Sequence, residues 1–342
     1  MIKVLVIDDS ALVRDILSEG LARDPEIQVV GSAPDPYVAR EKIAKLRPDV
    51  LTLDIEMPRM DGVQFLRYMM PQYPLPVVVV SALTEKGKRI TMEALEAGAV
   101  DFVTKPSSDV ARGLEIMLED IRQKVKQASM TDVSHWKQRT PTPAKVRMDT
   151  ALSTSTDKVI AIGASTGGVQ AISRILTQLP ATLPGIVIVQ HMPPGFTQTY
   201  AERLNEQCAI KVKEAKHGDR IMPGQALLAP GNLQMTVKRS GGVYLVHCEP
   251  GEKVSGHCPS VDVLFDSVAR FAGANAIGII LTGMGNDGAA GMLSMRRAGA
   301  RTMAQDEKSC VVFGMPCEGY KSGGAEFLIS LDNIPHKLVS FL

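Results

Sequence analysis

A glycine-rich turn in the second half of the chain carries a serine. The apolar run 159–163 predicts a strand, and the pattern over 169–179 predicts a helix. Ser165 lies between them in the spacing Gly163-x-Ser165-x-Gly167, in which small neighbours let a serine project from a sharp turn close to backbone N–H groups. The same turn could instead bind an anion at the start of the helix, so the motif alone leaves two interpretations.

Two further polar side chains follow predicted strands of the same half. His191 comes after the apolar run 185–190, and Asp287 lies beyond the run 276–281. Taken singly, the histidine could be structural, and the aspartate could cap the helix that follows it. The carboxyl ends of parallel strands meet at one edge of a sheet, so Ser165, His191 and Asp287 are expected to converge as a catalytic triad. The chain order serine, histidine, aspartate differs from that of α/β-hydrolases and indicates another scaffold.

Three carboxylates follow predicted strands in the first half. Asp8 and Asp9 come after the apolar residues 3–7, and Asp54 comes after the strand 50–53. Such a cluster repels itself unless a cation lies among the oxygens, and an all-oxygen donor set suits Mg²⁺ better than Zn²⁺. The sequence therefore predicts a magnesium site at this edge of the first sheet.

A lysine and a hydroxyl are expected at the same edge. Lys105 and Ser81 each follow an apolar strand of the first half. With the carboxylates and a divalent cation they form a site that could take a phosphoryl group on a carboxylate. Helix capping would explain Asp8 or Asp9 but not Lys105.

Short strands alternate with helical patterns on both sides of a Ser/Thr-rich segment, residues 129–157. We predict an α/β domain over 1–125, a flexible linker over 126–157 and a second α/β domain over 158–342. The alternation predicts a doubly wound parallel sheet in each domain. Turns between 226 and 248 have the spacing of hairpins, so an antiparallel edge should extend the second sheet.

The composition excludes several classes of protein. The chain has 342 residues, long enough for about two domains of about 150 residues each, and 38 Lys and Arg balance 37 Asp and Glu, without the cationic excess of a nucleic-acid-binding protein. Apolar runs fall far short of the roughly 20 residues of a membrane span, and acidic residues interrupt the first run too early for a signal peptide. Five cysteines without framework spacing indicate reduced thiols. We expect a cytoplasmic, monomeric protein with no disulfide and no membrane insertion.

The first half resembles the receiver domain of bacterial response regulators. The resemblance rests on Asp8-Asp9, Asp54, Met57-Pro-Arg-Met-Asp-Gly62, Ser81 and Lys105-Pro106. It implies that Asp54 is the phosphoacceptor and that Mg²⁺ is held by Asp9, Asp54 and the Glu56 carbonyl, with Asp8 acting through water. It also implies that Lys105 contacts the phosphoryl oxygens and that Ser81 and Phe102 are the pair of switch residues.

The second half closely resembles the CheB chemotaxis protein-glutamate methylesterases. The motifs that carry this resemblance are Gly163-Ala-Ser-Thr-Gly-Gly168, Gln190-His-Met-Pro193, Pro259-Ser-Val-Asp-Val-Leu-Phe265, Thr282-Gly-Met-Gly-Asn-Asp-Gly288 and Val311-Val-Phe-Gly-Met-Pro316. It implies hydrolysis of glutamate methyl esters on chemoreceptors and deamidation of receptor glutamines, controlled by phosphorylation from a chemotaxis histidine kinase. No cofactor is implied for the ester chemistry. A basic residue would be expected where Cys258 precedes Pro259, and the role of Cys258 stays open.

Several assignments in the second half remain undecided by sequence. The oxyanion donors are expected among the backbone N–H groups of Thr166, Gly167 and Met284. Zinc binding at His247-Cys248 or His257-Cys258 is disfavoured, because adjacent strand residues point to opposite faces and the usual Cys-x-x-Cys loops are missing. His217 lies in a polar stretch and could line the cleft or cap a turn.

Two rival functions come from different classes. One is a response regulator whose second half only binds a partner or DNA, although no helix-turn-helix pattern or basic stripe supports it. The other is a phosphorylation-gated esterase or deamidase that acts on something other than receptors. The sequence does not decide which receptor glutamates are modified, which kinase is the partner or how the domains dock.

Overall fold

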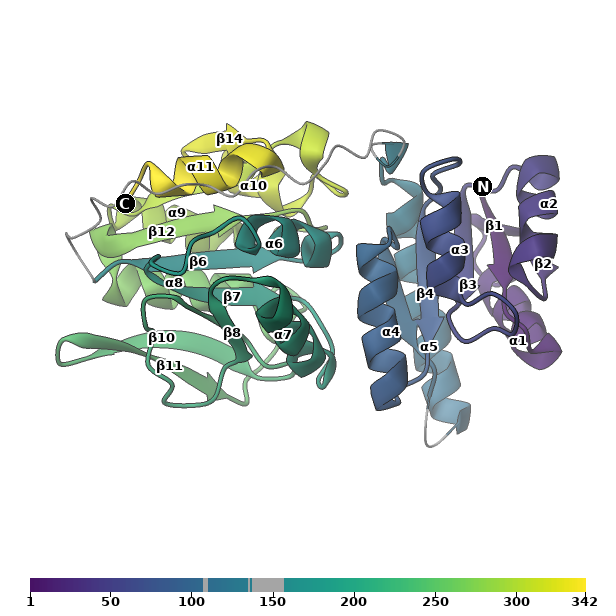
Figure 1. Cartoon of the computed structure of the whole chain (residues 1–342), viewed down its shortest axis with the longest axis horizontal. Coiled ribbons are helices and arrows are strands. Elements are labelled where there is room, and N and C mark those ends of the chain that lie inside the picture. The colour runs from purple at the N-terminus through teal and green to yellow at the C-terminus, as the bar shows by residue number, and fades with distance from the viewer. Residues whose placement is uncertain (107–109, 135, 137–156) are drawn as a thin grey trace. The chain divides into compact units, whose positions relative to one another are not determined.

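The chain folds into two compact units, residues 1–140 and 141–342. The structure is a computed structural model that describes residues 1–106, 110–134, 136 and 157–342 (Figure 1).

The last helix of the first unit passes the domain boundary predicted at residue 125. Helix α5 spans Val110–Ser129, because the buried residues Ile121, Val125 and Ala128 keep a helical spacing against the core. The predicted linker therefore begins inside a helix, and most of it, residues 137–156, lies outside the described residues.

In the first unit, strands and helices alternate strictly along the described chain. The elements are β1 (Ile2–Ile7), α1 (Ala11–Ala22), β2 (Ile27–Ala33), α2 (Pro36–Leu46), β3 (Val50–Asp54), α3 (Gly62–Met69), β4 (Val77–Ser81), α4 (Glu85–Glu96), β5 (Asp101–Thr104) and α5. The strands form a parallel sheet in the order β2-β1-β3-β4-β5, with helices on both faces (Figure 1). The strand order reverses between β1 and β3, and in such sheets ligands bind beyond the carboxyl ends of the strands at this point.

The second unit is larger and has the same alternation over most of its length. Its helices and strands are β6 (Val159–Ala164), α6 (Gly168–Leu176), β7 (Gly185–Gln190), α7 (Phe196–Gln207), β8 (Lys211–Glu214), β9 (Gln225–Leu228), β10 (Gln234–Ser240), β11 (Val243–Glu249), α8 (Val261–Phe271), β12 (Ala276–Ile280), α9 (Ala289–Arg297), β13 (Arg301–Gln305), α10 (Met315–Lys321), β14 (Phe327–Ile329) and α11 (Ile334–Val339). Short 3₁₀ turns are η2 (Gly273–Asn275), η3 (Glu307–Ser309) and η4 (Leu331–Asn333).

Seven of these strands form one parallel sheet in the order β14-β13-β12-β6-β7-β9-β8. The chain proceeds from β6 toward β7 in one direction and later from β12 toward β14 in the other. The reversal between β6 and β12 places the loops after these two strands side by side at the carboxyl edge of the sheet. The doubly wound fold predicted for both units is confirmed.

An antiparallel pair is present, but the prediction that it extends the large sheet is wrong. Among the strands of the described chain, β10 and β11 pair with each other in a separate two-stranded sheet and with no strand of the large sheet, and β9 lies parallel between β7 and β8. The reason is packing: Met235, Val237 and Val246 alternate on one face of the hairpin and are buried in a core with Leu264 and Val268 of α8. The hairpin thus buries its apolar face against a helix.

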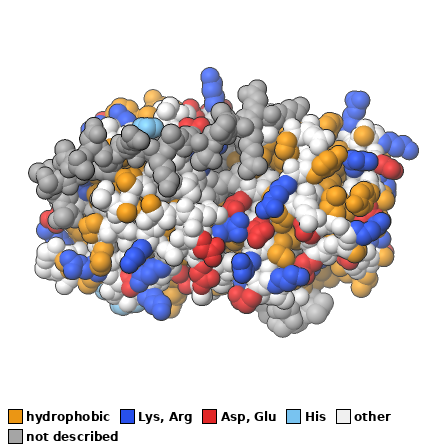
Figure 2. All heavy atoms as spheres, viewed as in Figure 1, with side chains coloured by type: hydrophobic (Ala, Val, Ile, Leu, Met, Phe, Trp, Pro, Cys, Tyr) orange, Lys and Arg blue, Asp and Glu red, His pale blue; other side chains and the backbone are white. Residues whose placement is uncertain are grey.

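The described surface carries mixed charge. On the face shown in Figure 2, Lys and Arg side chains are interspersed with Asp and Glu rather than gathered in one field. None of the helices in the described part of the chain combines the length and the hydropathy needed to cross a bilayer. All five cysteines are free thiols.

Candidate active site

Ser165 occupies the turn between β6 and α6, as predicted, and its backbone is held on several sides. Its N–H donates to the Thr282 carbonyl at 3.0 Å, and its own carbonyl accepts from Gly168 N–H at 2.7 Å and from Gln190 Nε2 at 2.9 Å. The loop after β12 also presses on the serine, because a Cβ built on Gly283 would lie 2.7 Å from the Ser165 Cβ. The residue at 283 must therefore be very small.

His191 is the neighbour of Ser165 across the sheet. The register pairs Ala164 with Gln190, and His191 N–H donates to the Ala164 carbonyl at 3.1 Å. The side-chain amide of Gln190 donates to the carbonyls of both Ser165 and His191, at 2.9 and 3.1 Å. Within the described residues the Ser165 hydroxyl makes no hydrogen bond to the His191 ring, and such contacts often tighten only when substrate binds.

Asp287 holds the other side of the His191 ring. Its Oδ2 lies 2.7 Å from His191 Nε2 and accepts from Val261 N–H, while its Oδ1 accepts from the Ser260 hydroxyl at 2.7 Å and Asp262 N–H at 3.0 Å. The carboxylate thus lies at the N-terminus of α8, where free N–H groups and the helix dipole favour negative charge. Burial alone would raise the pKa of Asp287, but the hydrogen bond and charge of His191, with the donors of α8, hold that pKa below its usual value.

The structure rejects the alternative that Asp287 merely caps the helix after it. The N-cap of α9 is Gly288, which has no side-chain cap, and Asp287 instead serves the N-terminus of α8. Because Nε2 of His191 is engaged with Asp287, Nδ1 is the ring nitrogen left for proton transfer. That Nδ1 is buried and has no hydrogen-bond partner among the described residues.

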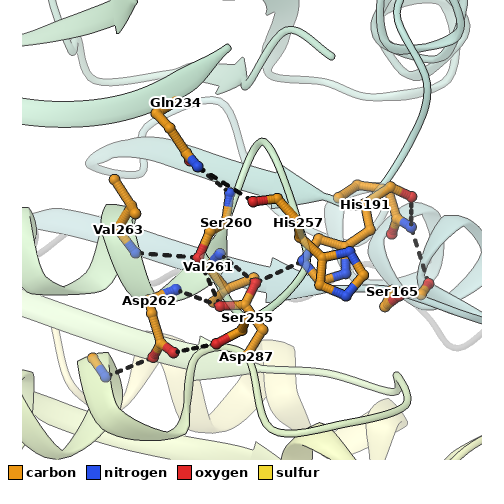
Figure 3. Close-up of polar contacts among 12 residues, drawn as sticks. Ser165, His191, Gln234, Ser255, His257, Ser260, Val261, Asp262, Val263 and Asp287 are labelled. Carbon is orange, nitrogen blue, oxygen red and sulfur yellow. Dashed lines mark hydrogen bonds and ion pairs between the residues drawn. The ribbon is translucent and has the colours of Figure 1, made fainter. Parts of the chain in front are cut away.

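A second histidine at the site was missed by the sequence analysis, which weighed His257 only as a zinc ligand. Its ring stacks on that of His191, with 3.6 Å between centroids and 12° between planes (Figure 3). Burial lowers the pKa of His257 to about 4, and the charge of His191 acts in the same direction. The only available signal was its place three residues before Ser260, the N-cap of the helix that holds Asp287.

The predicted oxyanion donors lie around the serine. Thr166 and Gly167 are in the turn between β6 and α6, and Met284 follows Gly283 in the loop after β12. Gly167 has a φ of 77°, in the left-handed region, and a Cβ there would lie 2.6 Å from Val311. This backbone conformation and this close approach explain the glycine.

A second cluster of predicted site residues lies at the carboxyl edge of the sheet in the first unit. Lys105 Nζ is 3.0 Å from both Asp8 Oδ2 and Asp54 Oδ1, and both carboxylates are buried. One carboxylate oxygen from each of Asp8, Asp9 and Asp54 lies within 4.8 Å of the others. Burial raises the pKa of Asp54 to about 6, against the opposing charge of Lys105. Helix capping does not account for Asp8 or Asp9, because Ser10 caps α1.

The remaining predicted residues surround this cluster. Ser81 is buried and accepts a hydrogen bond from Thr91 Oγ1 at 2.7 Å. Phe102 pairs with the residue two positions before Ser81, so both side chains lie on the same face of β4 and β5. Glu56 is exposed beyond β3. Gly62, which ends the motif 57–62, leaves no room for a side chain, because a Cβ there would lie 2.7 Å from the Asp54 carbonyl oxygen.

Comparison with known proteins agrees with this two-part organisation. Residues 160–338 match the CheB methylesterase family, and residues 4–128 match the response regulator receiver domain. A protein-glutamate methylesterase/protein-glutamine glutaminase of Syntrophotalea carbinolica is 65% identical over 344 residues, covering 100% of this chain and 98% of that protein. Its counterpart in Salmonella typhimurium is 50% identical over 339 residues, covering 99% and 96%.

A solved structure supports the assignment of the second unit. The crystal structure of the Thermotoga maritima CheB methylesterase catalytic domain superimposes with a TM-score of 0.53 at 36% identity, covering 54% of this chain and 98% of that one. The chain belongs to the CheB methylesterase family and carries a response regulator receiver domain in its first unit.

Proposed function

We propose that this chain is a protein-glutamate methylesterase that demethylates chemoreceptors, with a protein-glutamine glutaminase activity at the same site. The observation that supports it most directly is the 2.7 Å contact between His191 Nε2 and Asp287 Oδ2, beside a serine on the neighbouring strand. The names of the full-length relatives support the substrate class. All the proposed groups come from one chain, so a monomer suffices.

In the first half-reaction the Ser165 oxygen attacks the ester carbonyl carbon while His191 Nδ1 takes the hydroxyl proton. Asp287 keeps Nε2 occupied and stabilises the imidazolium that forms, because its carboxylate stays ionised. The tetrahedral intermediate collapses when His191 returns the proton to the methoxy oxygen. Methanol leaves, and a glutamyl ester on Ser165 remains.

The second half-reaction reverses these roles. Water attacks the glutamyl ester as His191 Nδ1 removes one of its protons, and the same nitrogen then protonates the Ser165 oxygen as the acyl bond breaks. The product is the glutamate side chain, which loses its proton to solvent. With a glutamine substrate, the first step releases ammonia instead of methanol.

Backbone N–H groups would stabilise the oxyanion of both intermediates. The Ser165 N–H already donates to Thr282, so the donors are drawn from Thr166, Gly167 and Met284. Among the described residues the N–H groups of Gly167 and Met284 have no acceptor. His257 stays neutral near pH 7 because of its lowered pKa, so it adds no positive charge beside the imidazolium.

The receiver is proposed to be phosphorylated on Asp54 by a chemotaxis histidine kinase. Its oxygen-only donor set fits Mg²⁺, and Asp8, Asp9, Asp54 and the Glu56 carbonyl would hold the ion. Bound Mg²⁺ would neutralise charge on the phosphoryl group. Lys105, 3.0 Å from Asp54, is placed to contact the phosphoryl oxygens.

Ser81 and Phe102 are the proposed switch pair, because they share a face of neighbouring strands that end at this site. A phosphoryl group on Asp54 would offer the Ser81 hydroxyl a stronger acceptor than the carbonyls of Ala82 and Gly87, to which it now donates only at 3.4 Å. Movement of Ser81 would then change the space open to Phe102.

The test is release of methanol from methyl-labelled chemoreceptor membranes by the purified full chain. We expect labelled methanol with the wild-type protein, more of it after addition of a small phosphodonor and Mg²⁺, and none with Ser165→Ala. A folded wild-type chain that released none under either condition would refute the proposal. Release from a methylated non-receptor protein at equal rate would retain the chemistry and refute the substrate class.

A further inference from the structure

Two histidines and a glutamate gather on the β10–β11 hairpin, outside the proposed catalytic groups. His247 and Glu249 are two residues apart on β11, so their side chains share the face opposite the one packed on α8. Cys248 between them is buried on the other face. His217 comes from the loop after β8 and meets His247 with 4.6 Å between ring centroids.

The backbone that carries these side chains is fixed on both edges. On one side β11 pairs with β10 along its whole length. On the other, the loop of His217 bonds to β11: Gly218 N–H donates to the Val246 carbonyl at 2.8 Å, and Val246 N–H donates to the Asp219 carbonyl at 2.9 Å. Hydrogen bonds therefore set the separation of the three backbone positions before any ligand arrives.

The donor atoms lie close to metal-binding separations. Glu249 Oε1 is 3.6 Å from His217 Nδ1 and 3.8 Å from His247 Nδ1, and one donor atom from each residue lies within 4.8 Å of the others. Ligands about 2.0 Å from a tetrahedral ion stand about 3.3 Å apart, so each histidine nitrogen is within about 0.5 Å of that separation from Glu249 Oε1.

The present contacts leave these groups poorly satisfied. His247 Nδ1 is buried and has no hydrogen-bond partner among the described residues, and its 3.8 Å distance to Glu249 is too long for one. His217 Nδ1 makes only a long contact of 3.4 Å with the Cys248 carbonyl. A buried unpaired imidazole nitrogen costs free energy, which a metal bond would recover.

We propose that His217, His247 and Glu249 bind one divalent transition-metal ion of the Zn²⁺ type, with a further coordination position open to solvent. Two imidazoles and a carboxylate suit Zn²⁺ and its neighbours, whereas Mg²⁺ and Ca²⁺ require oxygen ligands. Half or more of each of the His217 and Glu249 side chains is exposed, which leaves room for that position and an entry path. The inference is independent of the esterase proposal.

The test is a calorimetric titration of the reduced, metal-free full chain with Zn²⁺, in excess Mg²⁺ to occupy the receiver site. We expect one Zn²⁺ bound more tightly than about 0.1 mM, and at least about tenfold weaker binding in His247→Gln and in Glu249→Gln. Glu252→Gln and His336→Gln, which alter exposed residues of the same types elsewhere in this unit, should bind like the wild type.

A titration with Co²⁺ identifies the ligands. Its visible bands should be those of a nitrogen and oxygen site, without sulfur charge transfer, and should vanish in His247→Gln. Glu249→Gln keeps the test valid if the histidine variant misfolds, because Glu249 is exposed. The proposal is overturned if the wild type binds no Zn²⁺ below about 0.1 mM, or if both variants bind it unchanged, as thiols or the receiver carboxylates would.

Discussion

Asp287 accepts hydrogen bonds from four donors and therefore has two functions at the residue scale. It orients His191, and it satisfies the Ser260 hydroxyl and two N–H groups at the start of α8. Asparagine in place of Asp287 would have an NH₂ group where one of the acceptor oxygens now lies. That group would face N–H and O–H donors that it cannot satisfy, so both the stability of the fold and the orientation of His191 would be reduced.

Because Asp287 also stabilises the fold, its substitution should differ from that of Ser165 in its effect on stability, although both should reduce turnover. Ser165→Ala should abolish methanol release with the free energy of unfolding nearly unchanged. Asp287→Asn should lower turnover by at least about 100-fold and the free energy of unfolding by about 1–3 kcal/mol. Urea unfolding and turnover of both variants provide the measurement. A stable, fully active Asp287→Asn protein would contradict the assigned role.

Asp54 gives a prediction about pH and stability in the receiver. Its pKa is raised to about 6 in the folded state, chiefly by burial, so folding favours its protonated form. The stability that this group contributes is therefore present below about pH 4 and lost as the pH rises through 6. The change is about 3 kcal/mol, and Asp54→Asn should remove it.

Unfolding of the full chain without Mg²⁺ at several pH values from 4 to 7.5 would measure this. The only tryptophan, Trp136, reports on the receiver, because its ring lies against Gly98. The advantage of Asp54→Asn over the wild type should grow with pH. The matched control is Asp15→Asn, which changes an exposed carboxylate of the same unit. An advantage that is constant across the range would contradict the raised pKa.

At the scale of elements, the loop after β12 packs closely against Ser165, the proposed nucleophile. A Cβ on Gly283 would collide with Met315 Sδ and would lie 2.7 Å from the Ser165 Cβ. Gly283→Ala should therefore displace Ser165, lower turnover at least about tenfold and cost about 1–3 kcal/mol of stability. Gly242→Ala is the control, because nothing lies within 4 Å of its Cβ. Equal turnover of the two variants would show that the loop does not position the serine.

The elements also show what sequence could predict. Apolar runs located β1, β3, β6, β7 and β12 to within about a residue, because local burial sets their period, but β2, β8, β13 and β14 were not predicted. Once the strands were located, the polar side chains just beyond their ends could be predicted to share one edge of each sheet.

Long-range packing explains what was missed. Turn spacing predicted the β10–β11 hairpin but not its partner, since that depends on the apolar face of α8, which lies later in the chain. The stacking of His257 on His191 and the position of Asp287 at the start of α8 likewise depend on the folded path of the loop before that helix. No local pattern records such contacts.

At the scale of the whole molecule, the proposed phosphoacceptor and the proposed nucleophile belong to different units. Asp54 lies in residues 1–140 and Ser165 in residues 141–342, so phosphorylation can alter turnover only through the influence of one unit on the other. A coupling of about 1–3 kcal/mol between two such sites corresponds to roughly 5- to 150-fold in rate. This is within reach of a modest polar interface and requires no direct participation of the receiver in the chemistry.

If the unphosphorylated receiver restrains the enzyme, removing it should release activity. The fragment 158–342 should then turn over methylated receptor faster than the unphosphorylated full chain, and Asp54→Asn should keep the full chain at its low rate even with phosphodonor and Mg²⁺. That such a fragment folds is supported by the solved catalytic domain at 36% identity, 98% of which this chain covers. Turnover of the three proteins on one receptor preparation is the measurement. A fragment no faster than the unphosphorylated chain would exclude restraint, and activation would then require a positive action of the phosphorylated receiver, because phosphorylation would have nothing to relieve.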